Sequence, residues 1–294
     1  MESEGMVSGE GWISDDSSFY GDEEEQDRWT SLCNGHTTMN TAAHDLNIIL
    51  ARARAKPAPD LHNIYEGRMD SWQLHESIDD FLERLPPGQT TVSICPWIWV
   101  ANPHPSGRDR SGRSHAQDQL VPRGKLFLQQ ALQERDDIIS ENSRSAKGTV
   151  TRLLDQNGAH LKQKITDLAI DTNVLSGKWM LFRNAKSLES TWRKVAEATI
   201  NNRLGTAAKV ATDDGKGGDR LICVYTKDFR DAGDILRVVK EIAALGLLDG
   251  GRGIFYKSDA YTYLDIYGSN APAYGLQASL FSSKKLLSSA NYNN

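Results

Sequence analysis

Four basic residues are the side chains in this sequence that are best placed to do chemistry. Lys209, Lys216, Arg220 and Lys257 lie on adjacent predicted strands or on the turn that connects two of them. Their charges can therefore converge on one anion, and phosphate contacts of this kind give affinity without choosing a base sequence. The alternative is that Lys216 and Arg220 simply pair with the aspartates of their own turn, Asp213, Asp214 and Asp219.

A second basic set lies in residues 102–124, which the sequence predicts to be a long polar loop. Arginine stacks on bases and forks onto phosphate, so Arg108, Arg110 and Arg113 are further candidates for contacts with RNA or phosphate. A solvated loop without a ligand is the alternative. The nearby histidines have no carboxylate or thiolate at ligand spacing, so we expect no metal site.

Aromatic residues could supply surfaces on which bases stack. Trp97 and Trp99 share one face of a predicted strand because side chains alternate along it with a period of two. Tyr261, in a tyrosine-rich segment near the end of the chain, is a further possible stacking residue. Packing in the core, or in the wall of a sheet, is the alternative for each of them.

No motif in the sequence indicates catalysis or a cofactor. The three cysteines, Cys33, Cys95 and Cys223, are far apart and form no CxxC pair. The segment GKGG at 215–218 lacks the remaining residues of a phosphate-binding P-loop. We therefore expect a protein that is not an enzyme and that holds no cofactor or metal.

Charge is distributed unevenly over the 294 residues. Residues 1–30 hold ten acids and one base, a net charge of −9, which leaves +4 on the rest of a chain whose total is −5. A strongly acidic segment of this kind is typical of disordered chain that stays solvated. No run of apolar residues is long enough to span a membrane, and the N-terminus has no secretory signal. We expect a cytoplasmic or nuclear protein that does not contact membranes.

The periodicity of apolar residues predicts an α+β organisation. We expect a disordered acidic tail over 1–40, a linker with a helix near 43–55 over 41–75, one domain over 76–283, and a C-terminal tail over 284–294. Predicted strands lie within 91–103 and over 178–182, 207–211, 221–226 and 254–257, with a last extended segment over 259–268. Predicted helices cover 76–85, 125–142, 161–170, a segment from a Ser187 cap to 201, and a segment from an Asp231 cap to Gly246.

Several long strings of residues resemble a known family, that of basophilic leukaemia-expressed protein. The strings are PWIWVANP (96–103), GKWMLF (177–182), AAKVAT (207–212), RLICVYTKDFRD (220–231) and YKSDAYTYLDIY (256–267), together with the helix that contains Trp192. The resemblance implies a fold like that of translation initiation factor 4E, which is a curved, mainly antiparallel sheet with helices on its convex face. In that fold Trp179 and Trp192 would be two tryptophans of the core.

The same resemblance implies that recognition of the mRNA cap is lost. The two cap-stacking tryptophans would fall in the loop 107–110 and near Leu168, and neither place holds an aromatic residue. The guanine-pairing glutamate would fall near Ala169, whose side chain cannot accept a hydrogen bond. Lys216 and Arg220 match two of the phosphate-binding residues. We therefore expect a non-catalytic module that binds RNA, a nucleotide or another phosphate-bearing ligand. The alternative is a protein-interaction or scaffold module that binds no nucleic acid.

Overall fold

The structure, a computed structural model, describes residues 60–104, 113–248 and 253–291. The predicted acidic tail, the predicted helix near 43–55, and Arg108 and Arg110 lie outside the described residues, as does the side chain of Arg113. Among the helices that the structure describes, none combines the length and apolar character needed to cross a bilayer.

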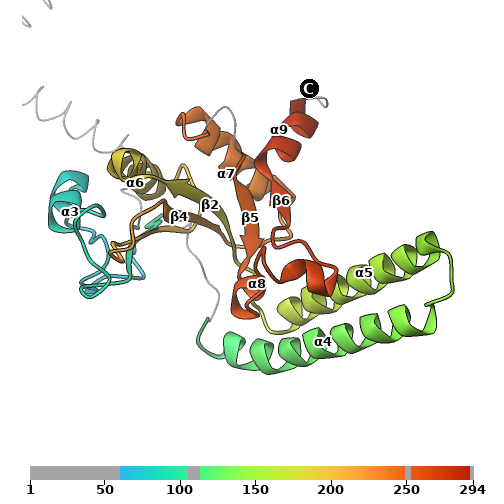
Figure 1. Cartoon of the computed structure of the whole chain (residues 1–294). Helices are drawn as coiled ribbons and strands as arrows, with labels where there is room; N and C mark the ends of the chain where they lie inside the picture. The colour runs from blue at the N-terminus through green and yellow to red at the C-terminus, as the bar shows by residue number, and fades with distance from the viewer. Residues whose placement is uncertain (1–59, 105–112, 249–252, 292–294) are drawn as a thin grey trace, which may run out of the picture. The chain divides into compact units, whose positions relative to one another are not determined.

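Six strands form a single antiparallel sheet in the described part of the chain (Figure 1), and helices pack around it. The predicted α+β class with a curved, antiparallel sheet is confirmed. The strand order is β1-β3-β4-β2-β5-β6. The strands are β1 (Trp97–Ala101), β2 (Gly177–Arg183), β3 (Ala207–Ala211), β4 (Arg220–Thr226), β5 (Phe255–Ser258) and β6 (Phe281–Ser282).

One face of the sheet is the wall of the main core. Helices α6 (Ala185–Ile200) and α7 (Ala232–Ala244) pack on it through apolar residues that recur at helical spacing. Trp179 of β2 and Trp192 of α6 are fully buried, which confirms the prediction that both are core residues. The indole N–H of Trp179 donates a hydrogen bond to the carbonyl oxygen of Ile235 at 3.2 Å, which ties β2 to α7.

Short polar side chains cap the N-terminal ends of the two core helices. Asp231 accepts a hydrogen bond from the N–H of Asp234, and Gly246 adopts a left-handed φ of 68° at the other end of α7, as predicted. The predicted cap of α6 at Ser187 is wrong. Asn184 is the cap, because its side-chain oxygen accepts the N–H of Ser187 at 3.1 Å, so Ser187 lies at the third helical position.

Two segments differ from the sequence prediction because tertiary packing overrides their local patterns. Helix α4 (Arg113–Glu141) includes residues that we expected in the long loop, with Pro122 inside the helix and Leu120 fully buried. The predicted last extended segment begins instead with the short helix α8 (Asp259–Tyr263), which Ser258 caps by accepting the N–H of Tyr261. Gly124 of α4 packs against the side chain of Leu264, just after α8.

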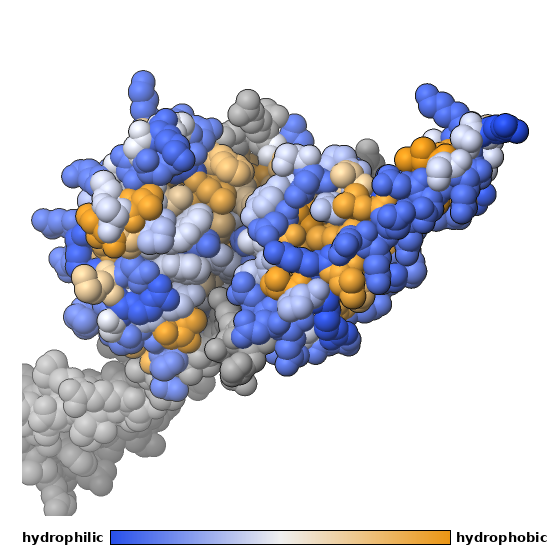
Figure 2. All heavy atoms as spheres, turned by 60° about the horizontal axis from the view of Figure 1, so that its bottom comes forward, coloured by the Kyte–Doolittle hydropathy of each residue, from blue (hydrophilic) through white to orange (hydrophobic). Residues whose placement is uncertain are grey.

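Helix α4 forms a hairpin with α5 (Lys147–Asp171), which is longer than predicted. The hairpin meets the 3-10 helix η2 (Ala271–Tyr274) at a contact between two glycines, where a Cβ on Gly158 would lie 2.5 Å from the carbonyl oxygen of Gly275. From residue 132 to residue 156, the outer half of the hairpin, no side chain is buried. The surface of the hairpin, at the right of Figure 2, accordingly mixes hydrophilic and hydrophobic residues.

Two further helices lie at the ends of the described chain. Helix α3 (Ile78–Arg84) confirms the prediction for residues 76–85, with Ser77 as its cap. The predicted C-terminal tail, residues 284–294, is helical as far as Asn291, since α9 (Ser283–Asn291) follows β6 directly. Contacts between α9 and α7 hold this last helix on the domain.

Candidate ligand-binding face of the sheet

Aromatic and basic side chains gather on the face of the sheet opposite α6 and α7. The strand register places alternate residues there, since Trp99 pairs with Lys209, Lys209 with Cys223, and Cys223 with Met180. We call this surface the open face. Its residues are Trp97, Trp99, Lys178, Met180, Phe182, Lys209, Cys223, Tyr225, Phe255 and Lys257.

A tryptophan–lysine cluster, formed by Trp97, Trp99, Lys209 and Tyr225, occupies one end of the open face. The Lys209 ammonium lies 3.8 Å from the centre of the Trp97 ring and 4.8 Å from that of Trp99. The ring of Trp99 is stacked on that of Tyr225, with centroids 5.9 Å apart, and meets Tyr65 edge-on at 5.4 Å. Trp97, Trp99 and Lys209 are half-buried, so the cluster presents rings and a cation at the surface.

A pair of buried lysines, Lys178 and Lys257, lies on the neighbouring strands. They face each other directly across β2 and β5. The Lys178 ammonium is 2.6 Å from a carboxylate oxygen of Asp259 and donates to the hydroxyl of Thr262 at 2.9 Å. The Lys257 ammonium lies 4.1 Å from the centre of the Tyr267 ring. Burial, with a contribution from the charge of Lys178, lowers the pKa of Lys257 to about 8.

The structure brings together two of the four cations that we expected at one site. Lys209 and Lys257 share the open face. Arg220 alternates with the open-face residues of β4, so it points to the other side of the sheet, where its guanidinium lies 3.0 Å from Asp213. It also donates to the carbonyl oxygen of Pro87 at 2.6 Å. The expected convergence is therefore wrong for Arg220, which makes the pairing within the turn that was the alternative.

Lys216 lies in the turn between β3 and β4, away from the other candidates on the strands. Its backbone N–H donates to the carboxylate of Asp214 at 3.1 Å, and the turn contains three glycines at positive φ, Gly215, Gly217 and Gly218. These contacts fix the backbone of the turn rather than the Lys216 side chain. Lys216 is thus placed at the tip of a hairpin and not within the open face.

Tyr261 does not present its ring for stacking. It is buried beside α8 in the main core, where burial raises the pKa of its hydroxyl to about 12. Tyr267, which lies six residues further on, is the half-exposed tyrosine next to Lys257. Sequence reasoning missed Lys178, because only the pairing of β2 with β5 brings it opposite Lys257.

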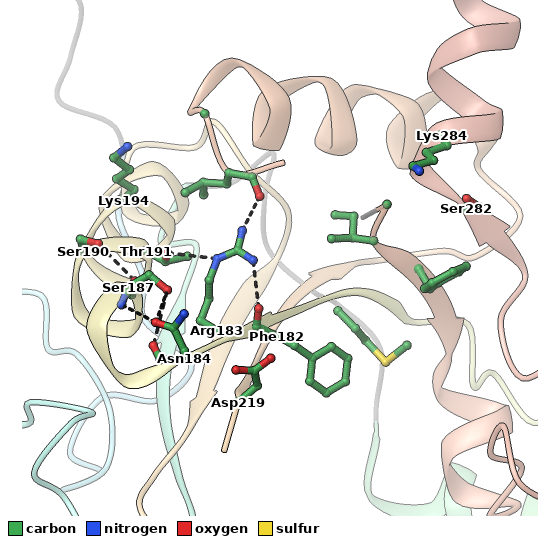
Figure 3. A pocket seen from close by; sticks show the side chains of 16 residues that line it. Phe182, Arg183, Asn184, Ser187, Ser190, Thr191, Lys194, Asp219, Ser282 and Lys284 are labelled. Atoms are coloured by element: carbon green, nitrogen blue, oxygen red, sulfur yellow. Dashed lines mark hydrogen bonds between the residues drawn. The ribbon is translucent and has the colours of Figure 1, made fainter. Parts of the chain in front are cut away.

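A pocket of about 1050 Å³ adjoins the other end of the open face, where β2 extends beyond β5 (Figure 3). Phe182 and Phe255 line it and are 54% and 49% exposed, which is unusual for phenylalanine. Arg183, in the middle of Figure 3, is buried and donates to the carbonyl oxygens of Phe182 and Leu247. The first turns of α6 supply a polar wall, so the pocket combines an apolar side with a polar one.

The described residues hold no cluster of three or more histidine, cysteine or acidic side chains that could bind a metal ion. Cys223 lies within the open face but is buried, and burial raises the pKa of its thiol to about 11. Its thiolate is therefore scarce at neutral pH, and thiolate is the nucleophilic form. The arrangement of rings and cations on this face is suited to binding a ligand by stacking and charge.

A comparison with protein families agrees with the resemblance found in the sequence. The family model described as basophilic leukemia-expressed protein Bles03 matches residues 22–265, well over half of the chain. The match includes strands β1 to β5, and with them the tryptophan–lysine cluster and both buried lysines. The likeness to initiation factor 4E stays a prediction.

Proposed function

Since the chain belongs to the basophilic leukemia-expressed protein Bles03 family, we propose that it is a non-catalytic module that binds single-stranded RNA on the open face of its sheet. The proposal includes a cytoplasmic or nuclear location and excludes ordinary recognition of the mRNA cap. It rests mainly on one observation, the Lys209 ammonium held against the half-buried rings of Trp97 and Trp99.

This arrangement suits an unpaired strand better than a duplex. Proteins that bind single strands combine cations, which follow the phosphate backbone, with aromatic rings, on which the splayed bases stack. Duplex RNA keeps its bases stacked inside the helix and offers no ring face to a tryptophan. The open face supplies both kinds of group on the flat surface of a sheet, so bases and phosphates could be contacted side by side.

The spacing of the cations favours an extended ligand. Lys209 lies on β3 and Lys257 on β5, three strand spacings apart in the sheet order. Neighbouring strands are separated by about 4.8 Å, so the two lysines are on the order of 14 Å apart. The ring of Tyr225 lies between them, 5.9 Å from the Lys209 ammonium and 5.5 Å from that of Lys178. Because Tyr225 and Lys178 are buried, a strand of several nucleotides would contact this path mainly at the half-buried Trp97, Trp99 and Lys209.

The burial of two α5 residues supports the exclusion of cap binding. Leu168 and Ala169, which stand near the expected positions of a cap-stacking tryptophan and of the guanine-pairing glutamate, are both buried in the core. A cap-binding slot in this region would need their side chains at the surface. The cap should therefore have no advantage over an ordinary guanosine nucleotide.

The test is fluorescence anisotropy with labelled single-stranded oligonucleotides of mixed sequence at low salt. Trp97→Ala should weaken binding roughly tenfold, because stacking on one ring contributes about 1–3 kcal/mol. Lys209→Met should weaken it similarly for every sequence, since phosphate contacts do not distinguish bases. Lys240→Met is the matched control, because Lys240 is exposed on α7, across the sheet from the open face. Absence of binding by the wild-type protein, or equal losses for Lys240→Met, would reject the proposal.

A protein-interaction function is the second candidate, and the pocket beside the open face favours it. Exposed Phe182 and Phe255 form an apolar surface next to polar residues, and such surfaces are typical of protein contacts. Chemical crosslinking of the cellular protein followed by mass spectrometry would test this, since Lys194 and Lys284 border the pocket. Crosslinks from these lysines to one protein that are lost in Phe182→Asp but kept in Lys209→Met, which removes only the proposed RNA contact, would support this candidate.

A further inference from the structure

Lys257 is a buried cation that has no ion-pair partner among the described residues. Only 5% of its surface is exposed, and Lys178 lies directly opposite it. Lys178 is fully engaged by Asp259 and Thr262 of α8. Within the described residues, the Lys257 ammonium contacts the ring of Tyr267 at 4.1 Å and makes no ion pair.

The charges around this pair do not balance. Two ammonium groups share the single carboxylate of Asp259, which also accepts a hydrogen bond from the hydroxyl of Ser176. The next acid, Asp265, is paired with Lys125 of α4 at 3.8 Å. Burying a charge without a partner is costly, and a ring face offsets only part of that cost. One further negative charge would complete the site.

A ligand could reach the Lys257 ammonium from the surface. The ammonium makes no hydrogen bond to the described residues, yet it is not fully enclosed. It therefore retains access to solvent. Tyr267, whose ring covers it, is itself half-exposed. A ligand would therefore approach the ammonium past the Tyr267 ring, at the β5 side of the open face and away from the tryptophan–lysine cluster.

We infer that the Lys257 ammonium binds one backbone phosphodiester of the RNA strand, whose bases stack near Trp97 and Trp99. The inference rests on the proposed function and names a second contact for the same ligand. A phosphodiester carries one negative charge, which balances the site. A terminal phosphate monoester carries about −1.5 to −2 at pH 7 and would exceed the balance.

The test compares oligouridine of two and of eight nucleotides by anisotropy over a range of salt concentrations. For the octamer, Lys257→Met should reduce the slope of log K against log[salt] by about 0.7, the value for one phosphate contact on a single strand. Lys257→Arg should keep the wild-type slope, because the charge remains. The dinucleotide, which has one phosphodiester and binds at the tryptophan–lysine cluster, should respond to Lys209→Met and not to Lys257→Met.

The pH dependence gives a second readout. In the free protein the pKa of Lys257 is about 8, so octamer affinity should fall as the pH rises through that value, and Lys257→Arg should remove the fall. The charged and titratable groups that face Lys257 are Lys178 of β2, Asp259 of α8, and Asp265 and Tyr267 beyond α8. Lys178→Met removes a neighbouring charge that lowers the pKa of Lys257, so this variant should move the fall to higher pH.

The outcomes separate this inference from the proposed function. If the wild type binds the octamer but Lys257→Met has an unchanged salt slope at every length, the phosphodiester contact is refuted and the proposed function stands. If the wild type binds neither oligonucleotide, both are refuted. If inorganic phosphate at millimolar concentration abolishes the change in salt slope caused by Lys257→Met, the site binds free phosphate. That result would also refute the contact with the strand.

Discussion

Replacing Lys257 by methionine should stabilise the ligand-free protein at neutral pH, although it removes a residue from the proposed site. Burial and the neighbouring Lys178 lower the pKa of Lys257 from its ordinary 10.5 to about 8. Each pKa unit corresponds to about 1.36 kcal/mol between the charged and neutral forms. The charged form therefore destabilises the fold by up to about 3 kcal/mol, and methionine, which fills similar space without charge, should recover part of this.

The sign of the pH dependence follows from the same values. At pH 7 Lys257 is protonated in both the folded and the unfolded chain, so the full destabilisation is present. Between pH 8 and 10.5 the folded state loses its proton before the unfolded state does, and the destabilisation fades as the pH rises. The stability difference between Lys257→Met and the wild type should thus be largest below pH 8 and should shrink toward pH 10.

Urea denaturation monitored by tryptophan fluorescence, at pH 6.5, 8 and 9.5, measures this difference. Lys240→Met, at an exposed position on α7, is the matched control and should change stability by less than about 0.5 kcal/mol at each pH. A Lys257→Met variant that is less stable than the wild type at pH 6.5, with a difference independent of pH, would refute the reasoning about the unbalanced charge.

Four other outcomes can be checked with simple variants and reagents. Trp192→Ala should lower the free energy of unfolding by about 3–5 kcal/mol, as for other large core truncations, and an unchanged melting temperature would contradict the core assignment. Gly158→Ala should destabilise by about 1–3 kcal/mol, because its methyl group would clash with the backbone of Gly275, whereas Gly148→Ala, in open space on the same helix, is the control. In a Cys33→Ser, Cys95→Ser background at pH 8, Cys223 should react with a thiol reagent only as the protein unfolds; fast labelling would contradict its burial and raised pKa. A methylated-guanosine cap should compete for the protein no better than guanosine triphosphate, and selective cap binding would contradict the proposed ligand.

Much of the fold could be predicted because its signals are local. The strand at 178–182 was correct to within one residue at each end, and Asp231 and Gly246 delimit α7 as their chemistry predicts. The start of α4 was missed because its polar first turns carry no apolar stripe, and only the burial of Leu120 shows what holds them. The segment after Ser258 alternates tyrosines as a strand would, yet it packs as the short helix α8, which Ser258 caps and which buries Ala260 and Tyr261.

The residues of the candidate site could be predicted only where the alternation within a single strand is enough to place them. Alternation along β1 placed Trp97 and Trp99 on one face without any knowledge of the sheet. Lys178 belongs to the site because β2 pairs with β5, and these strands are separated by more than seventy residues. Arg220 was assigned to the wrong face, because its position depends on the register of β4 against β3.

The glycine contact at the base of the α4–α5 hairpin divides that hairpin into two halves with different susceptibilities to opening. The inner half shares the cooperative stability of the domain, whereas residues 132–156 have no buried side chain to tie them to it. Backbone amides in the outer half should therefore exchange with solvent deuterium through local fraying, at rates that do not track global stability. The turn at 142–146 is, for the same reason, the place where a foreign sequence such as an epitope or a reporter could be inserted without disturbing either the sheet or its open face.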